Sequence, residues 1–308
     1  MTAPDFVRTP DANFDNLPDF PYAPHYLDWN GLRLHYVDEG PKEAPVALLM
    51  HGEPDWSYLY RKMIPPLLAA GYRCIAPDYI GFGRSDKVVD DNWYVIERHC
   101  ESITHLIKEL DVNDVTIFVQ DWGGPIGLRQ VADMPERFSR LAILNTWLHH
   151  AEMEYSDGIR QWRDNATNFF WLAMTDNDFP CGKIMAFARS RQVGDAGAIV
   201  AAYEAPFADG GKSKAGARRF PWCIPHWEPE AGNAADQERC FKALPTLGIP
   251  THVIFGADDN VFTEDWGRKW AGMIPGATFD SIPNAGHFVQ EDAGEEVVEI
   301  FLKRSRNA

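Results

Sequence analysis

The chain has few cysteines, few basic residues relative to acidic ones, and no long apolar run. The opposite of each of these features would indicate a particular class of protein. Its 308 residues include five cysteines, an odd number without any Cys-x-x-Cys pair, which argues against a disulfide framework or a zinc finger. It has 29 Lys and Arg residues against 45 Asp and Glu residues, which gives a net charge of −16. This charge argues against nucleic acid or an anionic membrane as a partner. No apolar run is long enough to span a membrane, and the N-terminus lacks a basic stretch followed by an apolar one. We therefore expect a cytoplasmic protein with reduced thiols.

What the chain does contain is an alternation of short apolar runs with helical patterns. Asn30-Gly31, a strong hairpin signal, separates the first two of these runs. Helical periodicity appears near residues 59–68 and over residues 93–110. The strand-like runs are residues 25–29, 32–37, 46–50, 73–76, 115–119, 141–144, 251–255 and 278–282. This alternation predicts an α/β fold in which helices cover both faces of a mostly parallel sheet.

The pattern changes after residue 147, where strand signals stop and aromatic residues become dense. They include Trp162, Phe169, Phe170 and Trp171. We predict a helical cap over residues 148–225, inserted into a core domain formed by residues 1–147 and 226–308. Ligands of open α/β sheets bind at the strand ends, so an apolar cap placed there predicts a dry pocket and a small neutral substrate.

An acid occupies a nucleophile's position at residues 120–124, QDWGG, where a strand turns sharply into a helix. In the nucleophile elbow of α/β-hydrolases, such a turn lifts the reactive side chain above the sheet, and Gly123 and Gly124 allow the tight approach. Asp121 is ionised at neutral pH without help from a base, so its first step should be displacement at an electrophilic carbon. The elbow predicts an α/β-hydrolase fold with a carboxylate nucleophile.

Two further residues complete a triad in the hydrolase order of nucleophile, acid and histidine. His287 follows the last strand and would act as the general base toward water. The acid that orients it follows the strand ending at residue 255, where Asp259 is preferred over its neighbour Asp258. The elbow also predicts an oxyanion hole made by the backbone N–H groups of Glu53 and Trp122.

Four stretches resemble the haloalkane dehalogenase family, and together they extend over core and cap. They are HGEPDWSYLYRKM at 51–63, QDWGG at 120–124, AYEAPF at 202–207 and NAGHFVQE at 284–291. In the position directly after His51-Gly52, this chain has Glu53, which resembles the subfamily that holds halide with two tryptophans. Another branch of the family has a halide-binding Asn at this position.

The resemblance implies how the predicted residues would act on a small neutral halogenated hydrocarbon. Asp121 would displace the halide and form an alkyl ester, which water activated by His287 would hydrolyse to a primary alcohol. Indole N–H groups would bind the halide. Trp122 would supply one, and the cap would supply the other through Trp162 or, alternatively, Trp171. A monomer or small homo-oligomer is expected, with no nucleic acid or membrane as a partner.

Two other functions could use the same fold. An epoxide hydrolase shares the Asp nucleophile and triad but protonates its substrate with cap tyrosines, for which Tyr155 and Tyr203 are candidates. A non-catalytic small-molecule receptor would not need the apparently intact triad. Glu53 and the tryptophan pair favour dehalogenation. The histidines and the glycine-rich residues 81–86 lack the spacing of a metal site or a dinucleotide fingerprint, so we expect no metal and no cofactor.

Overall fold

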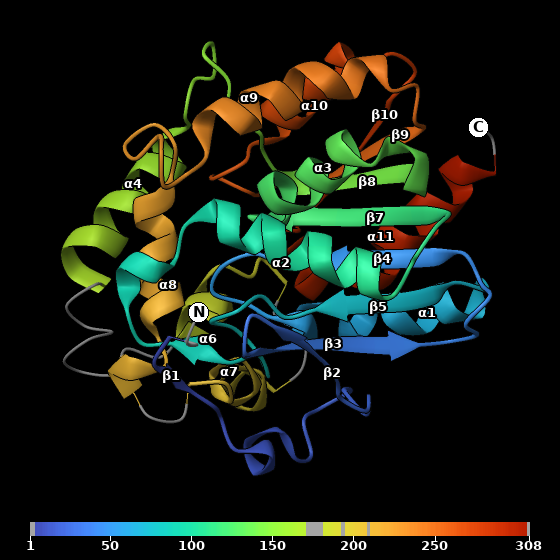
Figure 1. Ribbon diagram of the computed structural model, residues 1–308. Helices are drawn as coiled ribbons and strands as arrows, with labels where there is room; N and C mark the ends of the chain where they lie inside the picture. Colours follow the sequence, from blue (N-terminus) through green and yellow to red (C-terminus); the bar gives the residue numbers. More distant parts are fainter. Residues whose placement is uncertain (1–3, 171–180, 192–194, 208–209, 307–308) are drawn as a thin grey trace.

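The computed structural model describes residues 4–306 except 171–180, 192–194 and 208–209 (Figure 1). Its main element is an eight-stranded sheet with the strand order β10-β9-β8-β7-β4-β5-β3-β2. The strands are β2 (His25–Trp29), β3 (Leu32–Glu39), β4 (Val46–Met50), β5 (Arg73–Pro77), β7 (Val115–Asp121), β8 (Phe138–Thr146), β9 (Thr251–Gly256) and β10 (Thr278–Ile282). β2 and β3 pair antiparallel, as do β3 and β5, and the remaining pairs are parallel. The predicted, mostly parallel sheet is confirmed.

The turn between β2 and β3 has the geometry that its two residues favour. Asn30 and Gly31 both have positive φ, 55° and 81°, as a two-residue hairpin requires. A second sheet was not predicted: β1 (Phe6–Val7) pairs with β6 (Lys87–Val88). Strands of two residues are too short to show an alternating pattern, so the sequence carries no signal for them.

Helices cover both faces of the sheet, and alternate residues of each strand show which helices cover which face. Leu48 of β4 and Ile117 of β7 belong to a core cluster shared with α2 (Ile96–Glu109), α3 (Gly123–Asp133) and α10 (Glu264–Met273). Leu49 and Phe118 belong to a second cluster, shared with α1 (Ile64–Ala69) and α11 (Val289–Ser305). The period of two thus divides one strand between two cores, with α2 and α3 in front of the sheet and α11 behind it in Figure 1.

The described chain between β8 and β9 consists of helices joined by loops and turns. We call residues 148–225 the helical segment. It contains α4 (Asp157–Asn165), η5 (Ala166–Phe170), α6 (Cys181–Phe187), α7 (Ala196–Glu204), η6 (Gly210–Lys212), α8 (Ala215–Arg219) and η7 (Phe220–Cys223). α9 (Ala234–Ala243) then packs against α3 and leads the chain back to the sheet. In the described part of this stretch no strand occurs, as the loss of strand signals predicted.

The expected helices differ from the observed ones mainly at their N-terminal ends. Residues 59–68 form two elements, the 3₁₀ helix η2 (Ser57–Lys62) followed by α1, and Pro65 and Pro66 occupy the first turn of α1, where no N–H is needed. α2 begins at Ile96, after the short helix η3 (Asp91–Trp93), rather than at residue 93. Two more 3₁₀ turns, η4 (Pro135–Arg137) and η8 (Leu244–Thr246), precede β8 and β9, and η1 (Asp11–Phe14) lies near the N-terminus.

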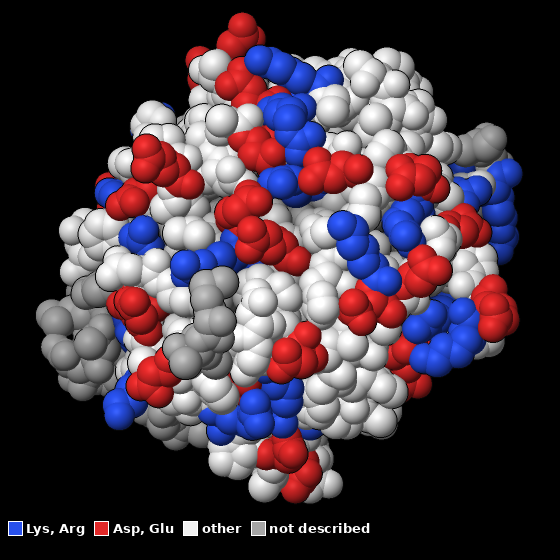
Figure 2. All heavy atoms as spheres, in the orientation of Figure 1, with Lys and Arg blue, Asp and Glu red and all other residues white. Residues whose placement is uncertain are grey.

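The surface and the cysteines agree with the composition. Acidic and basic side chains are interspersed over the face shown in Figure 2. All five cysteines are buried, as expected for thiols that pack in the core. None of the described helices combines the length and the apolar character that a membrane crossing would require.

Candidate active site

The candidate nucleophile lies at a strained turn between β7 and α3. Asp121 ends β7 with a φ of 48°, a left-handed conformation that is uncommon for any residue other than glycine. The hydroxyl of Thr146, at the end of β8, donates to its carbonyl oxygen. A Cβ at Gly123 would overlap the carbonyl oxygen of Met50, and one at Gly124 would overlap the Thr146 hydroxyl. Only glycines let α3 begin this close to β4 and β8, so the turn has the geometry of the predicted elbow.

Three side chains from different loops meet above the sheet. His287 Nδ1 lies 2.9 Å from Asp259 Oδ2, and His287 Nε2 lies 3.4 Å from Asp121 Oδ2. Asp259 is buried and is held in place by the side chain of Asn145 at 2.9 Å and by the backbone N–H of Val261 at 2.7 Å. The structure thus brings together the three residues of the predicted triad.

The alternative acid lies elsewhere. Asp258 is exposed, and its backbone N–H donates to the carbonyl oxygen of Ala285 at 2.9 Å. In this turn the first of the two acids supports the loop through its backbone, and the second projects toward His287. The geometry favours Asp259 as the acid that orients the histidine.

The loop after β4 supplies a hydrogen bond to the nucleophile. The backbone N–H of Glu53 donates to Asp121 Oδ1 at 2.9 Å, so one carboxylate oxygen is bound and the other, Oδ2, faces His287. Trp122 is the N-cap residue of α3, and its N–H therefore belongs to the unsatisfied donors of the first helical turn. The Glu53 N–H therefore contacts the nucleophile, and the Trp122 N–H stays a predicted second donor of the oxyanion hole.

Glu53 also brings a second carboxyl group close to Asp121. Burial, followed by the charges of Asp121 and Asp55, raises the pKa of Glu53 well above its usual value. Its Oε1 is buried and accepts no hydrogen bond from any described residue. These surroundings favour the neutral carboxylic acid, which avoids a second negative charge beside the nucleophile.

The electrostatic state of His287 is set by its two carboxylates. Burial favours the neutral imidazole, but Asp259 and the hydrogen bond to Asp121 outweigh burial and raise the pKa of His287 to about 10. A histidine between two carboxylates is therefore protonated while both are charged. Removal of one of these charges would therefore favour the neutral imidazole, which can act as a base.

Aromatic side chains form an apolar wall beside the triad. The ring of Trp122, which is only 3% exposed, lies edge-on to Trp147 at 4.7 Å and to Phe220 at 5.3 Å between centroids. Trp147 stacks on Phe262 at 4.8 Å, and Phe262 lies 5.6 Å from the ring of His287. The wall therefore continues from the helical segment to the histidine and gives the reacting groups a low-polarity environment.

The structure describes only one of the two candidates for the second indole donor. Trp162 lies on α4, is partly buried, and packs against the core cluster that contains Trp122. The start of α4 is fastened near Asp259, since the Ser156 hydroxyl donates to the carbonyl oxygen of Val261 at 2.7 Å. Trp171 lies outside the described residues.

The cap tyrosines considered for epoxide opening are engaged with other groups. The hydroxyl of Tyr155 lies 2.9 Å from Nδ1 of His149, and burial raises its pKa. The hydroxyl of Tyr203 donates to Glu291 at 2.7 Å, and burial raises its pKa well above the usual value. Both hydroxyls are therefore paired with other protein groups, and burial disfavours their ionisation.

Several supporting residues were not found from the sequence. Gln120 donates from Nε2 to the carbonyl oxygen of His287 at 3.1 Å, and Asn145 donates to Asp259. Asp292 accepts bonds from the N–H groups of Gly286 at 2.8 Å, Ser190 at 3.0 Å and Arg191 at 2.9 Å, which ties the helical segment to the histidine loop. Gln120 and Asn145 are polar residues at strand ends, a signal that could have identified them, whereas nothing in the sequence marks Asp292.

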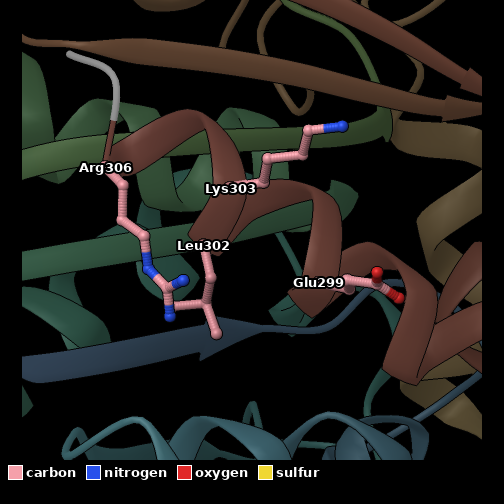
Figure 3. Close-up of a pocket in the computed structure, with 4 residues that line it drawn as sticks. All are labelled: Glu299, Leu302, Lys303 and Arg306. Atoms are coloured by element: carbon pink, nitrogen blue, oxygen red, sulfur yellow. The ribbon is translucent and has the colours of Figure 1, made fainter.

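One hollow on the described surface lies apart from the predicted site. A hollow along the last turns of α11 is lined by Glu299, Leu302, Lys303 and Arg306 (Figure 3). These residues come from the end of α11 and its C-cap, roughly three to five turns beyond His287, and none of them belongs to the predicted site. Over the described ranges, no three His, Cys, Asp or Glu side chains are grouped closely enough to hold a metal ion.

Comparison with known proteins agrees with this geometry. The family described as alpha/beta hydrolase fold matches residues 45–175. The chain is 40% identical to a haloalkane dehalogenase of Psychrobacter cryohalolentis, over 96% of this chain and 97% of that protein. It is 41% identical to one from Mycobacterium marinum, over 97% of this chain and 99% of that protein. The structure of haloalkane dehalogenase DpaA from Paraglaciecola agarilytica aligns with a TM-score of 0.87 and 36% identity, covering 96% of this chain and 97% of that one.

Proposed function

The chain belongs to the haloalkane dehalogenase family, and we propose that it hydrolyses carbon–halogen bonds through a covalent ester on Asp121. The observation that carries the mechanism is the unequal environment of the two oxygens of that carboxylate. Oδ1 accepts the N–H of Glu53 at 2.9 Å, whereas Oδ2 lies 3.4 Å from His287 Nε2. Asp121 is the proposed nucleophile, Asp259 the orienting acid and His287 the base.

In the first half-reaction, Oδ2 of Asp121 attacks the carbon that bears the halogen. A carbon–oxygen bond forms as the carbon–halogen bond breaks, and the bonding electrons leave with the halide. Charge moves from the carboxylate to the leaving group, so donors near the halide stabilise the transition state. We assign this role to the indole N–H of Trp122 and of Trp162, with Trp171 as the alternative second donor. A neutral Glu53 adds no negative charge that would repel the halide.

In the second half-reaction, water hydrolyses the ester on the enzyme. Alkylation neutralises Asp121 and so removes one of the two carboxylates that keep His287 protonated. With Asp259 still bound to Nδ1, the histidine can then lose its proton and accept another from water. The hydroxide attacks Cγ of Asp121, and negative charge develops on Oδ1 opposite the N–H groups of Glu53 and Trp122. Collapse breaks the bond between Cγ and Oδ2, and the departing alkoxide takes the proton of the newly formed carboxylic acid and leaves as the alcohol. Asp121 is then a carboxylate again and His287 is protonated again, so the proton that His287 first lost to solvent is the one net proton released.

We assign the helical segment, residues 148–225, as the cap and residues 1–147 with 226–308 as the core. The described part of the segment consists of helices and the loops between them, contributes Phe220 to the wall around Trp122, and contacts the histidine loop through Asp292. A cap in this position would exclude water from the first half-reaction and give the halide its second donor. The wall is formed by apolar rings and, over the described residues, offers a substrate no charged group to bind. It therefore favours small neutral halogenated hydrocarbons as substrates.

We further propose that the enzyme works in the cytoplasm as a monomer or small homo-oligomer. Five buried cysteines suit a reducing compartment. The related DpaA has been described as tetrameric, which supports an assembly of a few identical subunits. Size-exclusion chromatography with light scattering would distinguish the two states.

The proposed reaction is tested by halide release. Incubation with 1-bromobutane or 1,2-dibromoethane should release bromide and acid, and styrene oxide should not be converted to its diol. The variant His287→Gln should still release one equivalent of bromide and then retain an alkyl group on Asp121, visible as a mass increase of the intact protein. Diol formation from styrene oxide, together with no bromide from any short bromoalkane, would contradict the proposal.

A further inference from the structure

Beneath the oxyanion N–H of Glu53 lies a buried carboxylate that the mechanism does not use. Asp55 has no exposed surface, and its Oδ1 accepts the backbone N–H of Gly52 at 2.8 Å. The same oxygen lies 3.0 Å from Nδ1 of His51, which is equally buried. Asp55 therefore binds the residue that immediately precedes Glu53 and a side chain at the start of the same loop.

The hydrogen bonds of His51 fix the direction of this contact. The backbone N–H of Tyr79, in the loop after β5, donates to His51 Nε2 at 3.0 Å. Nε2 is therefore an acceptor, and the proton of a neutral ring lies on Nδ1, from which it is donated toward Asp55 and the nearby carbonyl oxygen of Gly52. A continuous path of hydrogen bonds thus joins the loop after β5 to the Gly52–Glu53 peptide.

The loop is also confined on its other side. A Cβ at Gly52 would overlap the side chain of Asp121, so this peptide already lies against the nucleophile. Asp55 holds Gly52 by its N–H, and Asp121 leaves Gly52 no room to move toward the nucleophile. Between these two contacts, the Glu53 N–H is directed at Oδ1 at 2.9 Å.

We propose that Asp55 is a positioning residue for the oxyanion hole: through Gly52 and His51 it aims the Glu53 N–H at Oδ1 of Asp121. This inference rests on the function proposed above and adds a role that the triad and the halide donors do not supply. Asp55 reaches the reacting atoms only through the loop that it supports.

The two half-reactions should respond differently to this N–H. In the first, Asp121 begins as a carboxylate and becomes an uncharged ester, so the hydrogen bond to Oδ1 is strongest in the ground state and does not accelerate the step. In the second, Oδ1 changes from an ester carbonyl to an oxyanion, so the hydrogen bond strengthens toward the transition state. Misdirecting the N–H should therefore slow ester hydrolysis and leave alkylation unchanged or slightly faster.

The test measures the two steps separately in Asp55→Ala. Rapid-quench experiments with 1-bromobutane follow bromide for alkylation and butanol for ester hydrolysis, while mass spectrometry follows the butyl-enzyme. We expect hydrolysis to slow by at least about tenfold, below the roughly 10²–10³-fold cost of removing an oxyanion donor outright, with alkylation within about threefold of wild type. The butyl-enzyme should accumulate during turnover.

Two further variants at the same position keep the test informative. Asn keeps an oxygen that can accept from Gly52 and His51, so Asp55→Asn should restore most of the hydrolysis rate. Asp55→Ser keeps a polar group but is too short to reach both donors, and it should repeat the selective loss if the alanine variant does not fold.

A buried carboxylate beside the N-terminal end of β5, away from this loop, provides the control. Asp38 Oδ1 accepts from Arg73 Nε at 2.7 Å and its Oδ2 accepts from Arg73 Nη2 at 2.8 Å, and the side chain of Asp38 is buried. Asp38→Ala removes these bonds without touching residues 51–53 or Tyr79. It should lower stability and keep the wild-type ratio of the two rates.

The outcomes separate the inference from the proposed function. If the wild-type enzyme releases bromide and butanol but Asp55→Ala slows both steps equally, or if Asp38→Ala shows the same selective loss, the positioning role is wrong and the dehalogenase mechanism stands. If the wild-type enzyme releases no bromide, the proposed function itself fails.

Discussion

Two regions of the molecule supply the proposed site in different ways. The sheet edge, which we define as the C-terminal ends of β4, β7, β8, β9 and β10 with the loops that follow, supplies the nucleophile, the acid, the base and the oxyanion loop. The helical segment supplies part of the apolar wall and the proposed second halide donor. Neighbouring strands in register place loop residues within hydrogen-bond distance of one another, whereas helices packed by side chains have no such fixed register. The sheet edge should therefore dominate the chemistry, and the helical segment should adjust it.

The largest expected effect contrasts two adjacent acids at the sheet edge. Asp259→Ala removes the partner of His287 Nδ1, so we expect ester hydrolysis to slow by about 10⁴-fold, as for an orienting acid in other triads. Asp258→Ala, the matched control, should stay within about twofold of wild type because its side chain is exposed. Steady-state bromide release from both variants measures the difference. Equal losses in the two would contradict the assignment of Asp259.

The next effect concerns a buried ion pair that joins the two regions. Arg61 on η2 donates twice to Glu291 at the start of α11, each at 2.6 Å, and Tyr203 of α7 donates to the same carboxylate. Glu291→Gln leaves the Arg61 charge buried without its partner, so we expect the free energy of unfolding to fall by about 3–5 kcal/mol in urea titrations. Tyr203→Phe, which removes only a hydroxyl, should cost about 1 kcal/mol. If Glu291→Gln lowers the free energy of unfolding no more than Tyr203→Phe does, the ion pair is not a structural link.

The same carboxylate gives a pH dependence of known sign. Although burial opposes ionisation, hydrogen bonds and charge from Arg61 lower the folded-state pKa of Glu291 from 4.5 to about 2. Its contribution to stability is therefore fully present above pH 4.5 and is lost as the pH falls toward 2. Unfolding measured between these limits should be steeper in pH for the wild type than for Glu291→Gln. Identical slopes would contradict the shift.

A smaller effect is expected where the helical segment is tied to the histidine loop. Asp292→Asn replaces an oxygen that accepts a backbone N–H, and the misplaced His287 should slow ester hydrolysis by about tenfold while alkylation changes less. Glu296→Gln is the control, because it removes only the partly exposed ion pair with Arg191, which is worth less than about 1 kcal/mol. If the control matches Asp292→Asn in rapid-quench assays, the three backbone bonds are not what positions the histidine.

The smallest expected effect belongs to the helical segment alone. Trp162→Phe removes one proposed N–H donor, and the dissociation constant for bromide, measured by quenching of tryptophan fluorescence, should rise about fivefold to tenfold. Trp93→Phe, in η3 outside the helical segment, is the control and should leave it unchanged. If Trp171→Phe weakens binding and Trp162→Phe does not, the second donor is Trp171.

The same contrast explains what the sequence could predict. Each strand of the sheet edge has its own apolar run, and parallel strands bring their C-terminal ends together, so the sequence alone predicts that Asp121 and His287 meet. The choice between Asp259 and Asp258 depended on the direction of one turn, which composition does not encode. Glu53 could be placed in the loop, but the neutral state that its surroundings favour depends on burial and on the nearby charges.

The sequence does not predict which side chains of the helical segment reach the site, for a physical reason. The end of the strand signals predicts helices in this segment. The hydrophobic pattern of a helix does not, however, fix its rotation or its position along its neighbours. The sequence therefore offered Trp162 and Trp171 without a register to separate them. Asp292 illustrates the same limit, because its three bonds reach Ser190, Arg191 and Gly286 across a contact between distant segments.

The two oxygens of the Asp121 carboxylate have different lifetimes in the proposed cycle. Oδ2 becomes the oxygen of the ester and leaves with the alcohol, and an oxygen from water takes its place. Oδ1, bound by the Glu53 N–H, remains with the protein. The first alcohol made by each enzyme molecule thus contains an atom of the original polypeptide, and each later one contains an oxygen that the previous turnover took from solvent. One half of this side chain is a permanent part of the enzyme, and the other half is a reagent that every turnover consumes and replaces.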